Sequence, residues 1–145
     1  MPGAASLAKR QYYAHPRNQF WAIVGDIRGF DAAAPYPERI ATLRAAHIAV
    51  WDVLASCIRA GSLDSGIDEG SIVVNQLAGF LARHPHLERI CFNGRRAEAA
   101  WRRHVLKRLP AARELQYFLL PSTSPAHAGW SYSRKLRAWR RALAV

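Results

Sequence analysis

The hydrophobic and polar positions in the first third of the chain predict short helices. The run NQFWAIVGDI, residues 18–27, suits a helix with Asn18 in the N-cap position. Residues 37–61 also show helical spacing, with a break near His47. Residues 1–17 show no period, so we expect this segment to be loop.

The pattern changes after residue 70, where short apolar runs alternate with helical ones. The apolar runs predict three strands, at residues 71–75, 88–94 and 114–124. Helical spacing predicts three helices, at residues 76–84, at 95–109 before Pro110, and at 129–145. Continuous apolar strands that alternate with helices are typical of a parallel sheet covered on both faces, so we predict an α/β fold.

Polar residues follow the predicted strands at their carboxyl ends. Asn75 ends the first strand, Asn93 and Gly94 end the second, and the sequence PSTS at 121–124 ends the third. In open parallel sheets, ligands bind in the crevice outside these ends. The sequence therefore places polar side chains where an α/β fold builds a site.

The last predicted helix is amphipathic and strongly basic. Its apolar positions lie at helical spacing: Tyr132, Leu136, Trp139 and Leu143. Its basic positions fall largely off that stripe: Arg134, Lys135, Arg137, Arg140 and Arg141. Such a helix is typical of a phosphate-binding face, a solvated surface or a helix that lies on a membrane.

The charge distribution favours a polyanionic partner. The 145 residues suit one domain with a single core, which we expect to span residues 1–145. Lys and Arg number 21 against 10 Asp and Glu, and residues 89–145 hold 13 of the basic side chains but only two of the acidic ones. This imbalance indicates a basic face for nucleic acid.

The sequence gives no sign of a membrane span or a metal centre. No apolar run approaches the roughly 18 residues that a spanning helix needs, and no signal peptide is recognisable. The two cysteines, Cys57 and Cys91, lie in apolar surroundings and are too few for a zinc or iron–sulfur site. We therefore expect a cytoplasmic monomer with reduced thiols, no metal and no cofactor.

Residues 11–21, QYYAHPRNQFW, concentrate aromatic and polar side chains in a short segment. From composition alone the aromatic residues favour core over site. Phe20 and Trp21 lie on the predicted helix, where we expect them to be buried. Tyr13 lies in loop before a proline, where a buried ring is harder to arrange.

Four motifs, in this order and spacing, resemble the uracil-DNA glycosylase superfamily: PG…SL…QYYAHPRNQFW, WDVLASC…GSLDS, FNG and LPSTSPAHA. The chain looks most similar to the branch that removes hypoxanthine, the deoxyinosine DNA glycosylases, and the resemblance runs over nearly the whole chain. It implies a three-layer α/β/α sandwich with a short parallel sheet of four strands. The family's first strand precedes a Pro-Gly turn, here Pro2-Gly3, so we expect that strand to be missing from this chain.

The resemblance also implies roles for residues near the start of the chain. In mismatch-specific relatives an Asn before the Pro-Gly holds the attacking water, and Met1 stands at that place here and cannot hold one. In the hypoxanthine branch the Asn of the HPRN element takes over, which implies Asn18, with His15 and Arg17 as candidate supporting residues. Tyr13 matches the ring that stacks on the flipped base.

Two further elements are implied in the later part of the chain. Asn93 matches a residue that reads the edge of the base. A loop matches the segment that presses into the duplex as the nucleotide leaves: Ser122, Thr123, Ser124, Pro125 and His127.

Each of these assignments has a plainer alternative. Asn18 suits an ordinary helix cap, and His15 suits a turn before a proline. Asn93 and Gly94 suit a turn from strand to helix. The residue types in the sequence are compatible with both the site roles and these plainer alternatives.

We predict a monofunctional DNA glycosylase of base-excision repair that hydrolyses the N-glycosidic bond of a flipped, deaminated base in double-stranded DNA. Hypoxanthine is the first candidate and uracil the second. An asparagine is no base near neutral pH, so positioning and stabilisation of the leaving base must supply most of the catalysis. Lys9 is the only lysine in the motifs, which favours hydrolysis over a Schiff-base lyase. The alternatives are a catalytically inactive DNA-binding relative and a metal-free hydrolase of free nucleosides.

Overall fold

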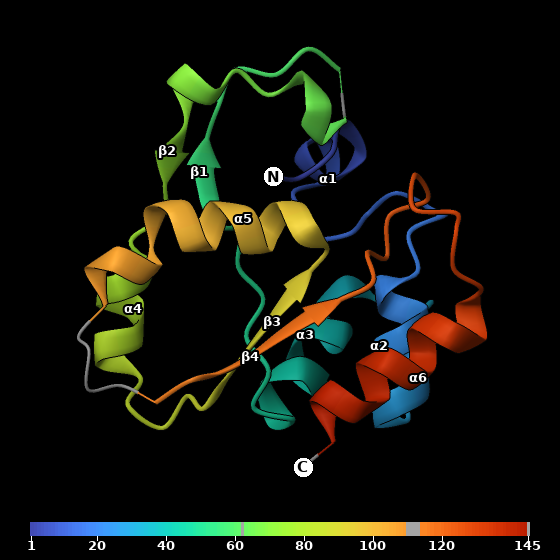
Figure 1. The fold of residues 1–145 in the computed structure, drawn as a ribbon. Coiled ribbons are helices and arrows are strands. Elements are labelled where there is room, and N and C mark those ends of the chain that lie inside the picture. Colours follow the sequence, from blue (N-terminus) through green and yellow to red (C-terminus); the bar gives the residue numbers. More distant parts are fainter. Residues whose placement is uncertain (62, 110–113, 145) are drawn as a thin grey trace. The chain divides into compact units, whose positions relative to one another are not determined.

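The computed structural model describes residues 1–61, 63–109 and 114–144 (Figure 1). The chain divides into two compact units. The first unit is Asp52–Leu120 together with Met1, and the second is Pro2–Trp51 together with Pro121–Val145. The middle of the sequence therefore forms one unit, and its two ends form the other.

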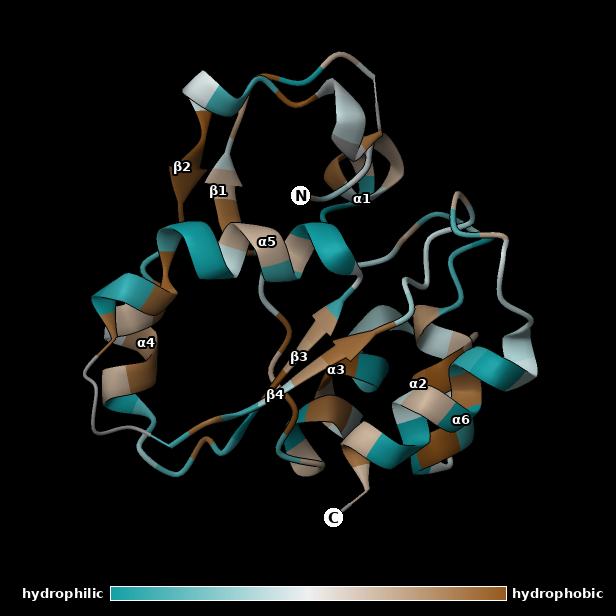
Figure 2. Ribbon diagram, in the orientation of Figure 1, coloured by the Kyte–Doolittle hydropathy of each residue, from teal (hydrophilic) through white to brown (hydrophobic). Residues whose placement is uncertain are grey.

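The first unit contains two pairs of strands. Strands β3 (Arg89–Asn93) and β4 (Gln116–Leu120) are parallel and pair residue by residue along their whole length. Strands β1 (Leu54–Ser56) and β2 (Val73–Val74) are antiparallel and form a separate short sheet. In Figure 2 the strands are mostly hydrophobic, which agrees with the apolar runs that predicted three of them.

Helices and short turns connect these strands. Helix α4 (Leu77–Arg83) precedes β3, and helix α5 (Arg95–His104) follows it and packs on the β3–β4 pair. Gly94, at φ 98°, makes the turn from β3 into α5, a conformation that favours glycine. Three 3₁₀ turns complete the unit: Asp64–Gly66, Glu69–Ser71 and Leu106–Arg108.

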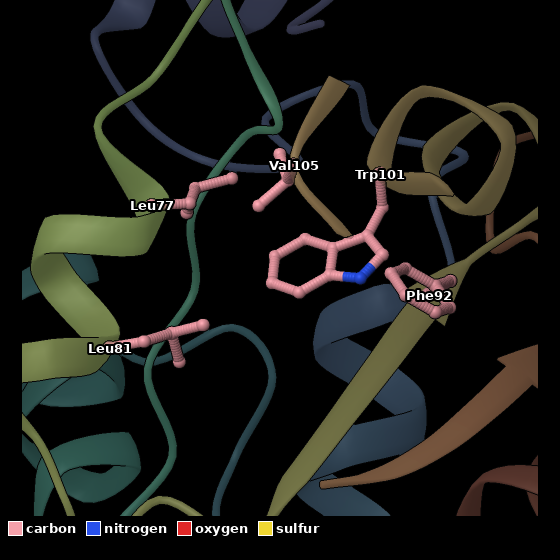
Figure 3. Packing of buried hydrophobic residues seen from close by; sticks show 5 residues of the cluster. All are labelled: Leu77, Leu81, Phe92, Trp101 and Val105. Atoms are coloured by element: carbon pink, nitrogen blue, oxygen red, sulfur yellow. The ribbon is translucent and has the colours of Figure 1, made fainter. Parts of the chain in front are cut away.

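The core of this unit consists of side chains from both helices and from β3. Figure 3 shows five of them, which form one cluster of buried side chains: Leu77, Leu81, Phe92, Trp101 and Val105. A second group, Leu54, Ile67 and Ala100, packs with the partly buried side chain of Met1. Met1 thus takes part in the packing of this unit.

The second unit is helical. Its helices are α1 (Ala4–Lys9), α2 (Phe20–Arg28), α3 (Tyr36–Ala45) and α6 (Tyr132–Leu143). Helix α2 ends at Gly29, which adopts φ 77° and donates its N–H to the Gly25 carbonyl at 2.7 Å. Helix α6 begins after Ser131, whose hydroxyl oxygen accepts the Arg134 N–H at 3.4 Å.

Helices α2 and α6 pack side by side although they come from opposite ends of the sequence (Figure 1). The ring of Trp139 meets the edge of Phe20 at a centroid distance of 5.7 Å. The Tyr132 hydroxyl donates to Asp26 Oδ2 at 2.7 Å. The pKa of Tyr132 is raised, mainly because the ring is partly buried and also because the Asp26 carboxylate is nearby. Arg28 adds a hydrogen bond of 2.8 Å to a carbonyl near the end of α6.

The predicted α/β class is confirmed, as are helices α2, α4, α5 and α6 and strands β3 and β4. Strand β2 was predicted correctly, but it pairs antiparallel with β1 and not within the parallel sheet. The prediction of a helix beyond His47 was wrong, because α3 ends at Ala45 and the chain forms β1 shortly afterwards. His47 adopts φ 55°, which breaks the helix where the break was expected.

Two other predictions were wrong. Residues 1–17 are not all loop, because helix α1 begins at Ala4 and ends at Lys9. A helix of this length is too short to show a period, and its Ala and Leu residues favour helix. Lys135 was placed off the apolar stripe of α6, yet only 2% of it is exposed. The predicted end of a helix at Pro110 lies outside the described residues.

Candidate active site

The backbone of residues 12–14 is held by three hydrogen bonds although it lies outside the helices. The Tyr12 N–H donates to the Tyr36 hydroxyl at 3.1 Å, and the Tyr12 carbonyl accepts the indole N–H of Trp21 at 2.9 Å. The Ala14 N–H donates to the hydroxyl of Ser6 at 3.1 Å. These contacts come from α1, α2 and α3, so the helical unit fixes this segment from three directions.

Tyr13 sits in the middle of this fixed segment with a left-handed backbone, φ 55°. Left-handed backbone is unfavourable for a residue with a bulky side chain, and the hydrogen bonds of the neighbouring Tyr12 and Ala14 help to hold it there. Its half-buried ring stacks on Phe20 with centroids 4.0 Å apart and planes 26° apart. Phe20 in turn meets Trp21 edge-on at 5.1 Å.

The expectation that Phe20 and Trp21 are core is confirmed, since 4% and 5% of them are exposed. Tyr13 is different, because only part of it is covered. One face of its ring therefore lies on the buried aromatic cluster. That arrangement gives a flat, rigidly supported ring at the border of the core.

Asn18 lies half-buried just before α2. Its backbone N–H donates to the His15 carbonyl at 2.9 Å, and its Oδ1 accepts the N–H of Phe20 at 3.0 Å. It thus satisfies a free N–H at the start of the helix, although Gln19 and not Asn18 is the N-cap residue. Among the residues that the structure describes, none accepts a hydrogen bond from Asn18 Nδ2.

His15 and Arg17 form the turn that leads to Asn18. The Nδ1 atom of His15 accepts the backbone N–H of Arg17 at 3.2 Å. His15 is half-buried, whereas Arg17 is exposed. The turn orients the imidazole, while the guanidinium extends into solvent.

Gln19 is a site candidate that the sequence prediction missed. Its N–H donates to the Thr123 carbonyl at 3.0 Å, which ties the start of α2 to the polar loop at 121–128. Its Oε1 is buried and receives no hydrogen bond from any described residue. A buried acceptor without a donor is costly, so it marks a place for a water or a ligand donor. The signal in the sequence was a polar amide at the start of an apolar helix.

The loop at 121–128 has its own internal hydrogen bonds. Ser122 Oγ accepts the N–H of Ser124, and Ser124 Oγ accepts the N–H of Ala126, both at 3.2 Å. The Ser124 carbonyl accepts the N–H of His127 at 3.0 Å. These short-range bonds fold residues 122–127 into consecutive turns.

Members of this loop differ in exposure. Ser122, Ser124, Pro125 and His127 are partly exposed, whereas Thr123 is completely buried. The side chain of Thr123 is therefore part of the packing beneath the loop. Lys135 lies beneath the other end, with its ammonium donating to the His127 carbonyl at 2.9 Å.

Asn93 belongs to the other unit. It is the last residue of β3, opposite Leu120 of β4, and it is half-buried. The next residue, Gly94, donates its N–H to the carbonyls of Phe92 at 2.9 Å and Leu120 at 3.1 Å. The expected strand-to-helix turn is therefore present, and it fixes the backbone that carries the Asn93 amide.

The basic side chains of α5 and α6 have different surroundings. On α5, Arg96 and Arg103 form salt bridges with Glu69, and Arg102 forms one with Glu98. On α6, the four arginines at 134, 137, 140 and 141 are exposed, and within the described ranges no Asp or Glu forms a salt bridge with them. Among the described residues, α6 therefore carries four exposed arginines without a salt bridge, whereas three arginines of α5 are paired with glutamates.

Across the described parts of the chain, no group of three or more His, Cys, Asp or Glu side chains is placed to hold a metal ion. In the same residues, no helix is long and apolar enough to cross a membrane. The polar groups of the candidate site are amides, hydroxyls and an imidazole. Such groups can position a substrate or a water through hydrogen bonds.

Comparison with known proteins identifies the family. No family model matches the sequence. A protein from Methanosarcina acetivorans named hypoxanthine DNA glycosylase is 35% identical over 138 residues, which cover 93% of this chain and 81% of that protein. The chain belongs to the hypoxanthine DNA glycosylase family. It is accordingly a DNA glycosylase, an enzyme that hydrolyses N-glycosyl bonds, and its substrate is DNA.

Two further matches agree with this family. A hypoxanthine DNA glycosylase from Methanosarcina barkeri is 36% identical over 98 residues, 67% of this chain and 61% of that protein. The solution NMR structure of a predicted uracil DNA glycosylase from Methanosarcina acetivorans matches with a TM-score of 0.75 and 32% identity. That match covers 98% of this chain and 83% of the other. The resemblance inferred from the motifs is therefore confirmed.

Proposed function

We propose that this glycosylase removes hypoxanthine from double-stranded DNA by simple hydrolysis in base-excision repair, with uracil as a second substrate. The observation that carries this proposal is the identity of 35% over 93% of the chain to a protein named hypoxanthine DNA glycosylase. The match of a solved structure to 98% of the chain supports a single glycosylase domain at residues 1–145.

In this proposal Tyr13 receives the flipped base. A base inside a duplex is out of reach, so the enzyme must extrude it, at a cost of a few kcal/mol that falls for mismatched bases. Stacking on an aromatic ring returns about 1–3 kcal/mol per base. The support of Tyr13 by Phe20, and its fixed backbone, mean that little order has to be gained when the base arrives.

Asn18 holds the attacking water in this proposal. Its Oδ1 is oriented by the Phe20 N–H, so the direction of the amide is defined. The Nδ2 group and the second lone pair of Oδ1 then remain for a water. Because an amide cannot take up the proton of that water, its contribution is to position the nucleophile. Polar groups that stabilise the leaving base must supply the rest.

Asn93 reads the edge of the base in this proposal. Hypoxanthine presents an N1–H donor beside the O6 acceptor, and uracil presents N3–H beside a carbonyl. A side-chain amide complements both through its oxygen and its NH₂ group. Adenine and cytosine present the reverse order, and a buried group left unpaired makes their rejection strong. The fixed end of β3 supports such a reading role.

The DNA backbone and the loop have separate parts in the proposal. The exposed arginines of α6 contact phosphates, which the absence of salt bridges among the described residues supports. The loop at 122–128 enters the duplex as the nucleotide leaves, with His127 at its partly exposed end. His15 and Arg17 support the turn before Asn18.

The monomeric state and the cytoplasmic location are part of the same proposal. The free thiols of Cys57 and Cys91 support a reducing compartment. Burial also raises the pKa of the Cys91 thiol, which keeps it unreactive. Size-exclusion chromatography with light scattering tests the monomer against its mass of 16.2 kDa.

A panel of duplexes, each with one modified base, tests the substrate. Under single-turnover conditions the enzyme should release free hypoxanthine fastest from a deoxyinosine duplex, uracil more slowly, and no base from undamaged DNA. Binding to all duplexes without release of any base would instead support an inactive DNA-binding relative. Release from free inosine nucleoside without salt dependence would support a nucleoside hydrolase.

A further inference from the structure

Lys135 is a buried cation that the proposed function does not use. It lies on α6 between the exposed Arg134 and Arg137, yet 2% of it is exposed. Burial lowers the pKa of its ammonium group. In the described residues the ammonium has one hydrogen-bond acceptor, the His127 carbonyl at 2.9 Å, and no carboxylate within salt-bridge distance.

Such a cation is not explained by stability. An ammonium group has three donors, so a single acceptor leaves most of its hydration unreplaced. A buried charge without a paired counter-ion is costly, and replacing it by an apolar side chain of similar volume is often neutral or stabilising. Lys135 and Trp139 are both buried and lie four positions apart on α6, where an apolar residue would be ordinary. A reason other than packing must account for the lysine.

The acceptor of Lys135 gives that reason. The loop at 121–128 is tied at its first residues by two neutral contacts, the Trp139 indole N–H to the Pro121 carbonyl and the Gln19 N–H to the Thr123 carbonyl, both at 3.0 Å. At its other end, among the described residues, the ammonium of Lys135 on α6 donates a hydrogen bond to the His127 carbonyl. The neighbouring residues Ala126 and Ala128 are exposed and offer little packing.

We propose that Lys135 is a positioning residue that holds the far end of the 122–128 loop, through the His127 carbonyl, in the conformation that engages DNA. A charge-assisted hydrogen bond is roughly twice as strong as a neutral one, which suits a segment with few other contacts. The proposal rests on the proposed role of this loop. In this proposal the buried ammonium lowers the folding stability of the enzyme but keeps the 122–128 loop in one conformation.

Amide hydrogen exchange tests the hold on the loop without any DNA. In Lys135→Met the Ala126 and His127 amides should exchange about tenfold faster, because their bonds to Ser124 lose the tether next to them. The Ile23 amide within α2 should keep its protection, and the melting temperature should stay equal or rise. Lys9→Met removes an exposed lysine of the same unit and should change neither the amide exchange of Ala126 and His127 nor the melting temperature.

Unchanged exchange at Ala126 and His127 would overturn the proposal. So would a lower melting temperature with faster exchange at Ile23 as well, because that result would make Lys135 an ordinary structural residue. These readouts need no cleavage. They therefore decide on Lys135 even if the wild-type enzyme released no base from any duplex, which would refute the proposed function alone.

Cleavage gives the second arm of the test. With a deoxyinosine duplex at saturating enzyme, Lys135→Met should lower the single-turnover rate about tenfold and leave the affinity for undamaged duplex unchanged. Lys135→Arg retains a charged donor and should restore most of the rate. An equal loss of affinity for all duplexes would mean that the ammonium contacts phosphate and would overturn the positioning role.

Discussion

Replacing Asn18 by Ala tests two roles of this side chain, one in folding stability and one in cleavage, that can be measured separately. The bond from the Phe20 N–H to Oδ1, at 3.0 Å and partly buried, is a helix-start contact, and its loss should cost about 1 kcal/mol of folding free energy. If the amide also holds the attacking water, single-turnover cleavage should fall about 100-fold, which corresponds to about 2.7 kcal/mol in the transition state. Duplex affinity should stay nearly constant, because the water contact matters mainly during cleavage.

The assay is release of free base from a deoxyinosine duplex at saturating enzyme, with denaturant unfolding measured on the same samples. Asn18→Asp is the matched control, because its carboxylate can still accept the Phe20 N–H and is favoured at the start of a helix. Its cleavage should survive and be lost as the pH falls through the pKa of the new carboxyl. Full cleavage by Asn18→Ala would refute the assignment and direct attention to Asn93 and Ser122–Ser124.

Three further predictions concern DNA contacts and pH. Replacing Arg137 and Arg140 together by Gln should weaken binding to all duplexes equally and flatten the slope of log affinity against log salt by up to about 1.8. Arg102→Gln, which removes a salt-bridged arginine, should change neither the affinity nor the slope. Weaker binding of deoxyinosine DNA alone would contradict this prediction. Tyr13→Ala should weaken binding of a deoxyinosine duplex relative to undamaged DNA by about 1–3 kcal/mol, whereas Tyr13→Phe should not. Titration of both duplexes measures this difference in affinity. Equal losses of affinity for both would contradict a stacking role. Because burial lowers the pKa of Lys135, the unfolded chain binds more protons just below the ordinary lysine value, so wild-type stability should rise relative to Lys135→Met as pH increases toward 10.5. Urea unfolding at several pH values checks this, and a constant difference would contradict it.

Local patterns predicted the elements that are long or bounded by clear turns. Strand β3 is an apolar run that ends in Asn93-Gly94, and both its end and the following helix were predicted from these residues. Strand β1 has three residues and follows a helical stretch, so its few apolar positions fit helical spacing equally well. Its pairing with β2, whose residues are about 20 positions away, is what makes it a strand.

The candidate site was predicted from motifs, whereas its supports were not. Tyr13 stood out by residue type, but the hydrogen bonds that fix the backbone on either side of it come from Ser6, Trp21 and Tyr36. Ser6 and Tyr36 lie outside the predicted helices, so the pattern gave no reason to expect these contacts. The burial of Lys135 could not be predicted, because a lysine in a basic helix normally faces water. The burial of Lys135 goes with its hydrogen bond to the His127 carbonyl, a tertiary contact that no local pattern encodes.

The pairing of α2 with α6 has a consequence for synthesis on the ribosome. Arg28 and the Leu143 carbonyl that it contacts are 115 residues apart, and the segment Asp52–Leu120 of the other unit is translated between them. At roughly 5–20 residues per second, α2 would wait about 6–23 seconds for its partner helix. During that interval Phe20 lacks the ring of Trp139 and exposes apolar surface. The unit that carries Asn18 is thus completed only after α6 has been translated, and until then its exposed apolar surface is prone to aggregation.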